Sequence, residues 1–300
     1  MVDWPSYNRS LVRRGEILFS YDFLDTWGYE LERMNEGKKG KPFTFPDSFI
    51  LVIGYIRYSF HLPYRQTEGI IKATGKRLPA NPPSYGQICK RINRLNIEIK
   101  RDKIDDDNDD IIVSIDSTGI KVTNRGQWMD EKWNTQNRKG YLKIHVAVDI
   151  KTKEILALEV TDEKVHDGRM LKKLVDHVLD SSSSESNMAK VKSVLADGAY
   201  DSNNNFQYLE NKRIKPGIKV RKNSIISCKN NSFRNKQVIP QSKDFLKWKK
   251  KRKYGCRWMA ETAFSSIKRT FGEQVSATRF QNMVKEIMIK VSLYNLFRRT

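Results

Sequence analysis

The sequence predicts an α/β fold in which a mixed sheet with helices on its faces follows a mainly helical N-terminal region. Three observations support this division. Helix start and stop signals mark the N-terminal third, six Asp residues gather in a short run after it, and segments rich in β-branched residues begin at residue 111. The predicted organisation is a helical region at 1–100, an acidic linker at 101–110 and an α/β domain at 111–300.

Capping signals place helices in the N-terminal region. Asp47 or Ser48 is the expected N-cap of an apolar helix that follows a proline. Pro63 opens a second helix, which ends at Gly75. Ser84 follows a proline-rich turn and is the expected N-cap of a third helix.

The segment at about 60–100 therefore has the order helix, turn, basic helix, and its last helix carries Arg91 and Arg94. This order is compatible with a helix-turn-helix in which Arg91 and Arg94 contact DNA. The turn is longer than is usual in that motif, and two helices packed in an ordinary bundle have the same pattern. Both interpretations stay open at the level of the sequence.

In the α/β domain the segments follow the order β-β-β-α-β-α-β-α, which indicates a mixed sheet. The second and third strands form a hairpin around the turn Lys151-Thr152-Lys153. The expected strands are 111–122, 141–150, 154–162, 190–200 and 214–220. The expected helices are 166–180, 206–213, 255–270 and 280–299.

The charge of the chain points to a polyanion as partner. Lys and Arg number 56 against 35 Asp and Glu, which gives a net charge of +21. Nucleic acid is favoured over a membrane surface, because no basic amphipathic helix with a wide apolar face is present. Apolar runs are too short for a membrane span, and the N-terminus lacks the apolar core of a secretory signal. Cys89, Cys228 and Cys256 are too far apart for a disulfide framework or a zinc site, so we expect a cytoplasmic protein.

Most of the positive charge lies in one segment. Residues 211–253 hold sixteen Lys or Arg and one acid, Asp244, and so carry +15 of the net charge. Such a segment is typical of a nucleic-acid-binding surface, where cations meet phosphates and aromatic rings stack on bases. The alternative is a solvated basic loop without a ligand. The expected DNA contacts in its densest part are Lys247, Trp248, Lys249, Lys250, Lys251, Arg252 and Lys253.

Two aspartates belong to apolar strands. Asp116 lies inside IIVSIDSTG, and Asp197 ends the strand in SVLADGAY. A carboxylate in or after a buried strand needs a partner or a metal ion as compensation. Ligands also gather at strand ends in open α/β sheets. The alternative is that each Asp only caps the turn that follows it.

A third carboxylate belongs to a helical stripe. Tyr254, Arg257, Glu261 and Lys268 are spaced three, four and seven residues apart, and at about 100° per residue they fall on one face of a helix. The alternative is a surface face with one Arg–Glu pair. Three carboxylates brought together suit Mg²⁺ or Mn²⁺, and two such ions promote displacement at a phosphodiester. Arg257 and Lys268 are then available for phosphate contacts.

These motifs together resemble those of the DDE transposases of bacterial and archaeal insertion sequences, in the IS-four/IS-five branch. In this chain, the segment IDSTGIKV, which contains Asp116, resembles the first motif of the family. The segment LADGAYDS, which contains Asp197, resembles the second motif. The resemblance extends over about residues 42–299. The last motif of the branch reads Tyr-x2-Arg-x3-Glu-x6-Lys, and this chain matches it at Tyr254, Arg257, Glu261 and Lys268.

The resemblance implies an RNase H-like catalytic core, with Asp116 on its central first strand, Asp197 at the end of the fourth and Glu261 on a later helix. The implied activity is cleavage at the terminal inverted repeats of an insertion sequence, followed by attack of the freed 3′ hydroxyls on target DNA. The implied cofactor is Mg²⁺ or Mn²⁺, two ions, held by the three carboxylates.

Further implications of the resemblance concern partners. Tyr254, Arg257 and Lys268 are expected to contact DNA near the cleavage point. The expected partners are double-stranded DNA, as inverted repeats and as target, and further copies of the chain in a homodimer or a higher synaptic multimer. The expected location is the prokaryotic cytoplasm, with the nucleoid.

Two other functions remain open. A metal-dependent nuclease of the same fold would cut without joining, and a non-catalytic DNA-binding protein derived from a transposase would bind without metal.

Four side chains near the motifs also allow two interpretations. His166 is either a helix-start cap or a supporting catalytic residue, and His145 is expected to be structural. Ser117 and Thr118 bond the metal shell or belong to a turn.

Overall fold

The computed structural model describes residues 3–75, 78–99, 110–122, 141–183, 190–221, 224 and 233–300. The chain forms two compact units. The acidic linker expected at 101–110 lies outside the described residues except for Asp110, which pairs with Lys192. The helical unit comprises Met1–Glu98, Thr270–Gly272 and Ala277–Thr300, and the sheet unit comprises Ile99–Arg269 and Glu273–Ser276.

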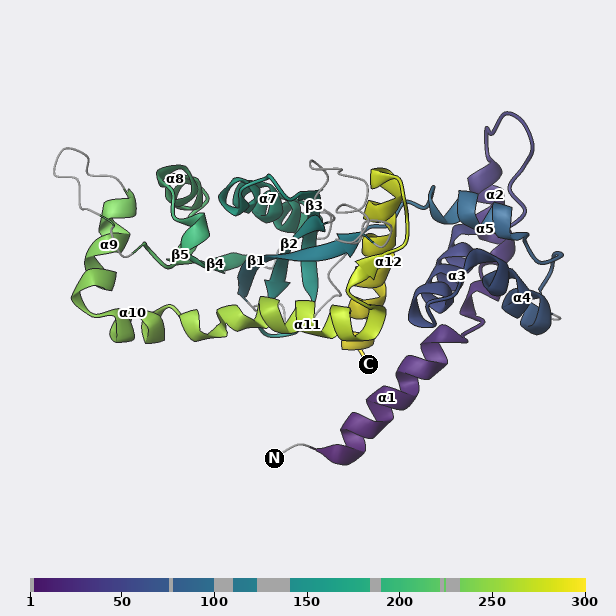
Figure 1. Cartoon of the computed structure of the whole chain (residues 1–300), viewed down its shortest axis with the longest axis horizontal. Helices are drawn as coiled ribbons and strands as arrows, with labels where there is room; N and C mark the ends of the chain where they lie inside the picture. The colour runs from purple at the N-terminus through teal and green to yellow at the C-terminus, as the bar shows by residue number, and fades with distance from the viewer. Residues whose placement is uncertain are drawn as a thin grey trace, which may run out of the picture. The chain divides into compact units, whose positions relative to one another are not determined.

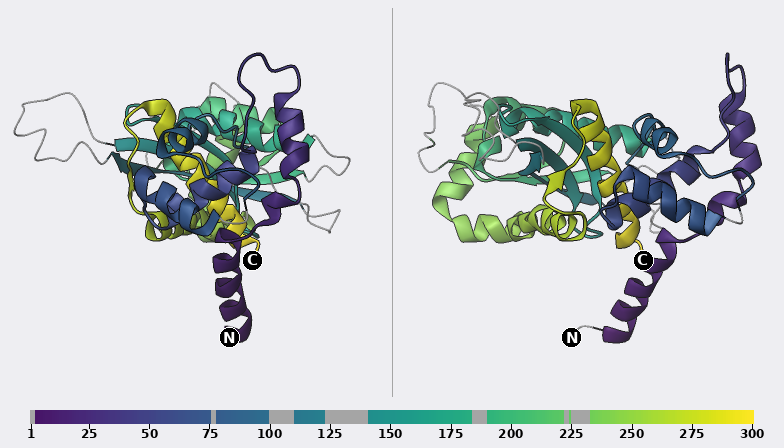
Figure 2. Two further views of the ribbon diagram at one scale, coloured as in Figure 1. Left: turned by 90° about the vertical axis from the view of Figure 1, so that its right-hand side faces the viewer. Right: turned by 45° about the vertical axis from the view of Figure 1, so that its right-hand side comes forward.

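The helical unit is organised around α3 (Asp47–Ser59), whose Ile50 and Ile53 are fully buried. Helix α12 (Phe280–Arg298) packs against it, and the hydroxyls of Tyr55 and Ser292 lie 2.8 Å apart. This packing explains why the C-terminal residues belong to the helical unit, whereas the sequence grouped them with 111–300. Other helices here are α1 (Trp4–Leu18), η1 (Asp22–Leu24), α2 (Trp27–Asn35), α4 (Tyr64–Thr74) and α5 (Tyr85–Ile92) (Figures 1 and 2).

The capping predictions for the two shorter helices are confirmed. Pro63 precedes α4 and Gly75 is its C-cap. Ser84 is the N-cap of α5, and its side chain and that of Gln87 form a reciprocal capping box. The expected turn thus separates α4 from α5.

The capping prediction for α3 is wrong. Pro46 holds the N-cap position and no side chain caps the helix there. Asp47 instead pairs with Arg91 at 2.6 Å, and Ser48 donates from its main-chain N–H to Glu30 at 3.0 Å. Both residues are therefore used for tertiary contacts, which the local sequence pattern does not reveal.

Within the described residues, the sheet unit contains a six-stranded mixed sheet with the order β3-β2-β1-β4-β5 and with β6 paired to β1 outside this path. Strand β1 runs antiparallel to β2 and parallel to β4, so it lies at the centre. This arrangement confirms the predicted α/β fold class with a mixed sheet. The strands are β1 (Ile111–Val122), β2 (Tyr141–Asp149), β3 (Ile155–Asp162), β4 (Val191–Ala196), β5 (Lys215–Ile218) and β6 (Gln274–Val275).

Helices cover both faces of this sheet (Figure 1). Helices α7 (Met170–Ser183) and α8 (Asn203–Asn211) lie on one face, and α10 (Phe245–Lys251) and α11 (Met259–Phe271) run along the other. The core under α7 joins Val113 and Ile115 of β1 to Leu171 and Leu174. Each of these side chains is essentially inaccessible to solvent, and full burial of one contributes about 1.5–3 kcal/mol.

The last part of the basic segment, residues 233–251, forms two helices that the sequence did not indicate. Helix α9 (Phe233–Lys243) is followed by α10, and the carboxylate of Asp244 caps α10 by accepting from the N–H of Lys247 at 2.8 Å. The 3₁₀ helix η5 (Tyr254–Trp258) then leads into α11. Of the helices that the structure describes, none is both long and apolar enough to cross a bilayer.

Candidate active site

Strand pairing brings Asp116 and Asp197 to neighbouring positions. Ser114 of β1 pairs with Leu195 of β4 in parallel register. Asp116 lies two residues further along β1, and Asp197 is the first residue after β4 ends. Adjacent strands are about 4.8 Å apart. Burial raises the pKa of the Asp116 carboxyl, and the negative charges of Asp197 and Glu261 raise it further. The two carboxylates therefore share one electrostatic environment with Glu261.

The turn alternative applies to one of the two aspartates. Asp116 lies in mid-strand, so it caps no turn, although the N–H of Ser117 donates to its Oδ1 at 2.9 Å. Asp197 is the N-cap of the 3₁₀ helix η4 (Gly198–Tyr200), and its Oδ1 accepts from the N–H of Ala199 at 2.8 Å. The cap fixes the orientation of Asp197 beside Asp116.

Arg257 connects Asp116 to Glu261. One guanidinium nitrogen lies 3.2 Å from Oδ2 of Asp116, and another donates to Oε1 of Glu261, in the first turn of α11. The expected Arg–Glu pair is thus present, and it extends to the strand aspartate. Tyr254 and Arg257 lie on η5, whereas Glu261 and Lys268 lie on α11, so the expected single helix is two consecutive helical segments.

An open cleft of about 430 Å³ adjoins these carboxylates. Lys268 lies in it and donates to Oγ1 of Thr118 at 2.9 Å. The cleft presents both carboxylates and cations. Its lining consists of Asp116, Ser117, Thr118, Glu261, Phe264, Ser265, Lys268, Arg269 and Glu273.

Asp197 and Tyr254 border this site without lining the cleft. Burial raises the pKa of the Tyr254 hydroxyl, and Arg257 lowers it again in part. The ring of Tyr254 packs on that of Trp248, with centroids 5.1 Å apart. Tyr254 therefore links the basic helix α10 to the carboxylate cluster.

The basic surface of α10 is exposed, but its tryptophan is not. Trp248 is 4% exposed, and its ring stacks on Phe245 with centroids 5.6 Å apart. The buried ring therefore holds α10 against the rest of the unit and presents no free face to a base. This differs from the expectation that Trp248 contacts DNA. Arg252 is half-buried and donates to Gln237 at 3.2 Å. The exposed cations are Lys247, Lys249, Lys250, Lys251 and Lys253.

The two arginines expected to read DNA differ in their surroundings. Arg91 pairs with Asp47 and its guanidinium lies 4.5 Å from the ring centroid of Phe43, so it stabilises the packing of α5. Arg94, just beyond α5, is exposed. The helical unit therefore offers Arg94, and not Arg91, as an unencumbered cation for a phosphate.

Two protein-family models match this chain. The model described as the transposase DDE domain matches residues 107–296, which is more than half of the chain. The chain belongs to the transposase DDE domain family. A second model with the same description matches residues 12–125.

Two solved structures are similar to this transposase DDE domain chain. One is the cryo-EM structure of a piggyBac transposase synaptic complex with hairpin DNA, with a TM-score of 0.41, 10% identity and coverage of 95% of this chain and 73% of that chain. The other is a simian T-cell lymphotropic virus intasome in complex with PP2A regulatory subunit B56 gamma, with a TM-score of 0.33, 10% identity and coverage of 79% and 66%.

The donor set of this transposase fits a hard divalent cation. Asp116, Asp197 and Glu261 offer only carboxylate oxygens, the ligands that Mg²⁺ and Mn²⁺ prefer. Burial, together with the negative charges of Asp197 and Glu261, raises the pKa of Asp116. A bound cation would neutralise this excess of negative charge. Among the described residues, no three acidic, His or Cys side chains are already grouped for a metal ion. Arg257 holds oxygens of two of the three carboxylates instead.

A second polar group in this transposase involves Ser117, which follows Asp116 in β1. Asp167, on the 3₁₀ helix η3 (Asp167–Arg169), accepts from the hydroxyl of Ser117 at 2.7 Å and from Lys143 at 2.6 Å. The fully buried His145 lies 3.6 Å from the same carboxylate oxygen. Ser117 thus lies in a strand, not in a turn, and contacts a carboxylate. His166 is the cap of η3, because its Nδ1 accepts from the N–H of Gly168 at 3.1 Å.

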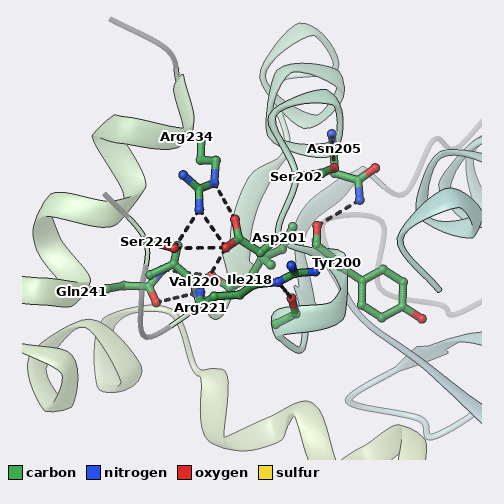
Figure 3. Close-up of polar contacts among 11 residues, drawn as sticks. Tyr200, Asp201, Ser202, Asn205, Ile218, Val220, Arg221, Ser224, Arg234 and Gln241 are labelled. Carbon is green, nitrogen blue, oxygen red and sulfur yellow. Dashed lines mark hydrogen bonds and ion pairs between the residues drawn. The ribbon is translucent and has the colours of Figure 1, made fainter. Parts of the chain in front are cut away.

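The sequence did not single out Asp167 or Lys143. The place of Lys143 follows from the pairing of β1 with β2, in which Ser117 lies opposite His145 and Lys143 is on the same side of β2, so no local sequence signal could have found it. Figure 3 shows another contact that the sequence did not indicate. Arg234 of α9 makes two hydrogen bonds to the buried Asp201, at 2.6 and 2.9 Å, and so fixes α9 to the loop that carries Asp197.

Proposed function

We propose that this transposase cleaves DNA at the terminal inverted repeats of an insertion sequence and joins the freed 3′ ends to target DNA, as a member of the IS-four/IS-five branch. One observation carries the proposal. The parallel pairing of β1 with β4 brings Asp116 close to Asp197, which directly follows β4, and Arg257 joins Asp116 to Glu261 at the edge of an open cleft.

In the proposed mechanism, two Mg²⁺ or Mn²⁺ ions would be held by Asp116, Asp197 and Glu261. When bound, such ions activate the attacking oxygen and stabilise the leaving oxygen of a phosphodiester. Lys268 contacts a phosphate in the cleft, and its hydrogen bond to Thr118 orients it. Since both cleavage and joining are attacks on a phosphodiester, by water and by a 3′ hydroxyl respectively, one carboxylate cluster serves both steps.

The basic helix α10 supplies the proposed hold on the DNA backbone. Its exposed lysines attract phosphates, and their number predicts a strong dependence of affinity on salt. Tyr254 connects this surface to Arg257 and the carboxylates. DNA held along α10 is thereby led towards the cleft.

The proposed partners follow from the reaction. Two element ends have to be joined to one target, which supports a homodimer or a higher synaptic multimer acting on double-stranded DNA. We assign recognition of the element end to the helical unit, with Arg94 as a phosphate contact, and place the reaction at the nucleoid in the prokaryotic cytoplasm.

Cleavage of a labelled duplex that carries the element's own end tests the function. We expect wild type to cut with Mg²⁺ or Mn²⁺ and to join a precleaved end to target DNA. Glu261→Gln should lose at least about 100-fold in rate, because even residues that only orient metal ligands contribute 10–100-fold. Glu210→Gln, on α8 at the opposite face of the sheet, is the matched control and should cut normally.

Each alternative function has its own outcome in this assay. Metal-dependent cutting without any joined product indicates a nuclease. Salt-dependent binding without cutting under any metal indicates a non-catalytic DNA-binding protein. Full activity of Asp116→Asn or of Glu261→Gln contradicts the proposed site.

A further inference from the structure

Arg257 occupies the position between Asp116 and Glu261 that a cation would neutralise. Its guanidinium lies 3.2 Å from Oδ2 of Asp116 and also donates to Oε1 of Glu261. The guanidinium is about one-quarter exposed, so its two contacts are partly shielded from solvent. The positive charge that balances the cluster in this structure is thus a side chain of the protein itself.

A carboxylate oxygen that is bound to the guanidinium of Arg257 is a poorer ligand for a metal ion. An oxygen that accepts from a guanidinium directs its lone pair at that donor, and a cation at the same oxygen would lie beside a fixed positive charge. Arg cannot lose its proton to relieve this conflict. The guanidinium therefore opposes metal binding by Asp116 and Glu261 for as long as it stays between them.

The main chain of Arg257 is fixed, whereas its side chain can turn towards a DNA phosphate that the proposed function places in the adjoining cleft. The hydroxyl of Ser114 donates to the carbonyl of Arg257 at 2.7 Å, which ties η5 to β1. The long side chain can turn without moving this anchor. The adjoining cleft is where the proposed function places a DNA phosphate, and Arg pairs with phosphate in the same two-pronged geometry as with carboxylate.

We infer that Arg257 makes metal loading depend on DNA. Without DNA, its guanidinium holds Asp116 and Glu261 and competes with divalent cations. With DNA in the cleft, a phosphate takes over the guanidinium and leaves both carboxylates to the metal ion. This inference rests on the proposed function and adds an order of events to it, with DNA before metal. Because coupling is reciprocal, metal also strengthens DNA binding.

Mn²⁺ binding in the absence of DNA tests the inference without any need for catalysis. The free Mn²⁺ signal in electron paramagnetic resonance gives the affinity for wild type and for Arg257→Gln. We expect Arg257→Gln to bind Mn²⁺ about 10-fold more tightly or better, the equivalent of one charge-assisted hydrogen bond removed from the competitor. An unchanged or weaker affinity overturns the inference.

A matched control removes a lysine that also pairs with a carboxylate but belongs to no carboxylate cluster around a cleft. Lys173→Gln removes the lysine that lies 2.8 Å from Glu159 on β3, leaves His177 at 3.3 Å from the other oxygen, and should leave Mn²⁺ affinity at the wild-type value. An equal gain in Lys173→Gln shows that any freed carboxylate binds Mn²⁺, which contradicts a specific role for Arg257. Circular dichroism checks folding, and Arg257→Lys, expected to bind Mn²⁺ with intermediate affinity, provides a second variant.

A second arm adds DNA. A duplex with the element end should raise the Mn²⁺ affinity of wild type and of Glu210→Gln equally. It should change the Mn²⁺ affinity of Arg257→Gln less than threefold. Equal enhancement by DNA in Arg257→Gln contradicts the coupling. Failure of the site itself is distinguishable, because Asp116→Asn and Glu261→Gln would then bind Mn²⁺ as wild type does.

Discussion

The hydroxyl of Ser114 on β1 donates a hydrogen bond of 2.7 Å to the main-chain carbonyl of Arg257, 143 residues later in the chain. Ser114 is fully buried, so no water replaces it as a donor. The bond joins the strand that carries Asp116 to the turn that carries Arg257. The spacing of the proposed catalytic groups thus depends on a residue that is not one of them.

Ser114→Ala should reduce cleavage about 10-fold and the free energy of unfolding by about 1 kcal/mol, because it removes a hydrogen bond whose donor is fully buried. Ser193→Ala is the matched control. The Ser193 hydroxyl is also buried and donates to the carbonyl of Lys215 at 2.8 Å, between β4 and β5. Urea denaturation and cleavage rates should show similar stability losses but reduced activity only in Ser114→Ala. Equal activity of the two variants contradicts the role of Ser114.

Breaking the pair of Arg234 and Asp201 should destabilise the sheet unit strongly. Asp201 is 0% exposed at its side chain, and removal of one partner of a buried pair costs about 3–5 kcal/mol. We expect Arg234→Gln and Asp201→Asn each to lower the urea midpoint, and the double variant to lose clearly less than their sum. Lys192→Gln, which breaks an exposed pair with Asp110, should cost less than about 1 kcal/mol. Additive losses in the double variant would argue against a direct pair.

His145 should make stability fall in mild acid. Burial lowers the pKa of this imidazole from 6.5 to about 4, and the nearby Lys143 contributes, while Asp167 opposes the shift. Between these values the unfolded chain binds a proton that the folded chain does not, so the free energy of unfolding decreases as pH falls from 6.5 to 4, by at most about 3 kcal/mol.

The measurement for His145 is the free energy of unfolding in urea between pH 7 and 4. The slope in this window should be shallower in His145→Gln than in wild type. The exposed His177→Gln should keep the wild-type slope. A wild-type slope in His145→Gln would show that other groups cause the pH dependence.

The lysines of α10 should determine the salt dependence of DNA binding. Replacing both Lys249 and Lys250 by Gln should reduce the slope of log affinity against log salt by about 1.8, or 0.9 for each phosphate that is no longer neutralised. Fluorescence anisotropy at several salt concentrations gives the slope. Lys190→Gln, just before β4 at the end away from Asp197, should keep it. Trp248→Ala should instead lower stability by about 3–5 kcal/mol, because the ring is buried.

The features that could be predicted from sequence are those with a local or periodic signature. Runs of β-branched residues indicated β1 and β4, and Asp116 and Asp197 stand out in them because a charge interrupts an apolar run. The i,i+4 spacing of Arg257 and Glu261 predicted their pair. That Asp116 comes close to Asp197 is a structural result, because it depends on the parallel register of β1 and β4.

What the sequence missed depends on contacts between distant residues. Asp167 meets Ser117 across 50 residues, and Arg234 meets Asp201 across 33. No local pattern encodes such pairs. Trp248 was expected to face DNA because cations surround it in the sequence, but the ring packs on Phe245, since an aromatic side chain gains more from burial than from exposure.

Helix α11 is attached to β1 beyond both of its ends. Before it, the carbonyl of Arg257 accepts from Ser114, and after it, Gly272 with a φ of 80° turns the chain so that β6 pairs in parallel with β1 at Lys121. A helix tethered at both ends to one strand has no free end on which to swing, so the slot between them is preorganised. In the proposed function, the nucleic acid rather than the protein backbone would have to deform at the point of reaction, and we expect sequences that bend or unstack easily to enter the cleft at the lowest free energy.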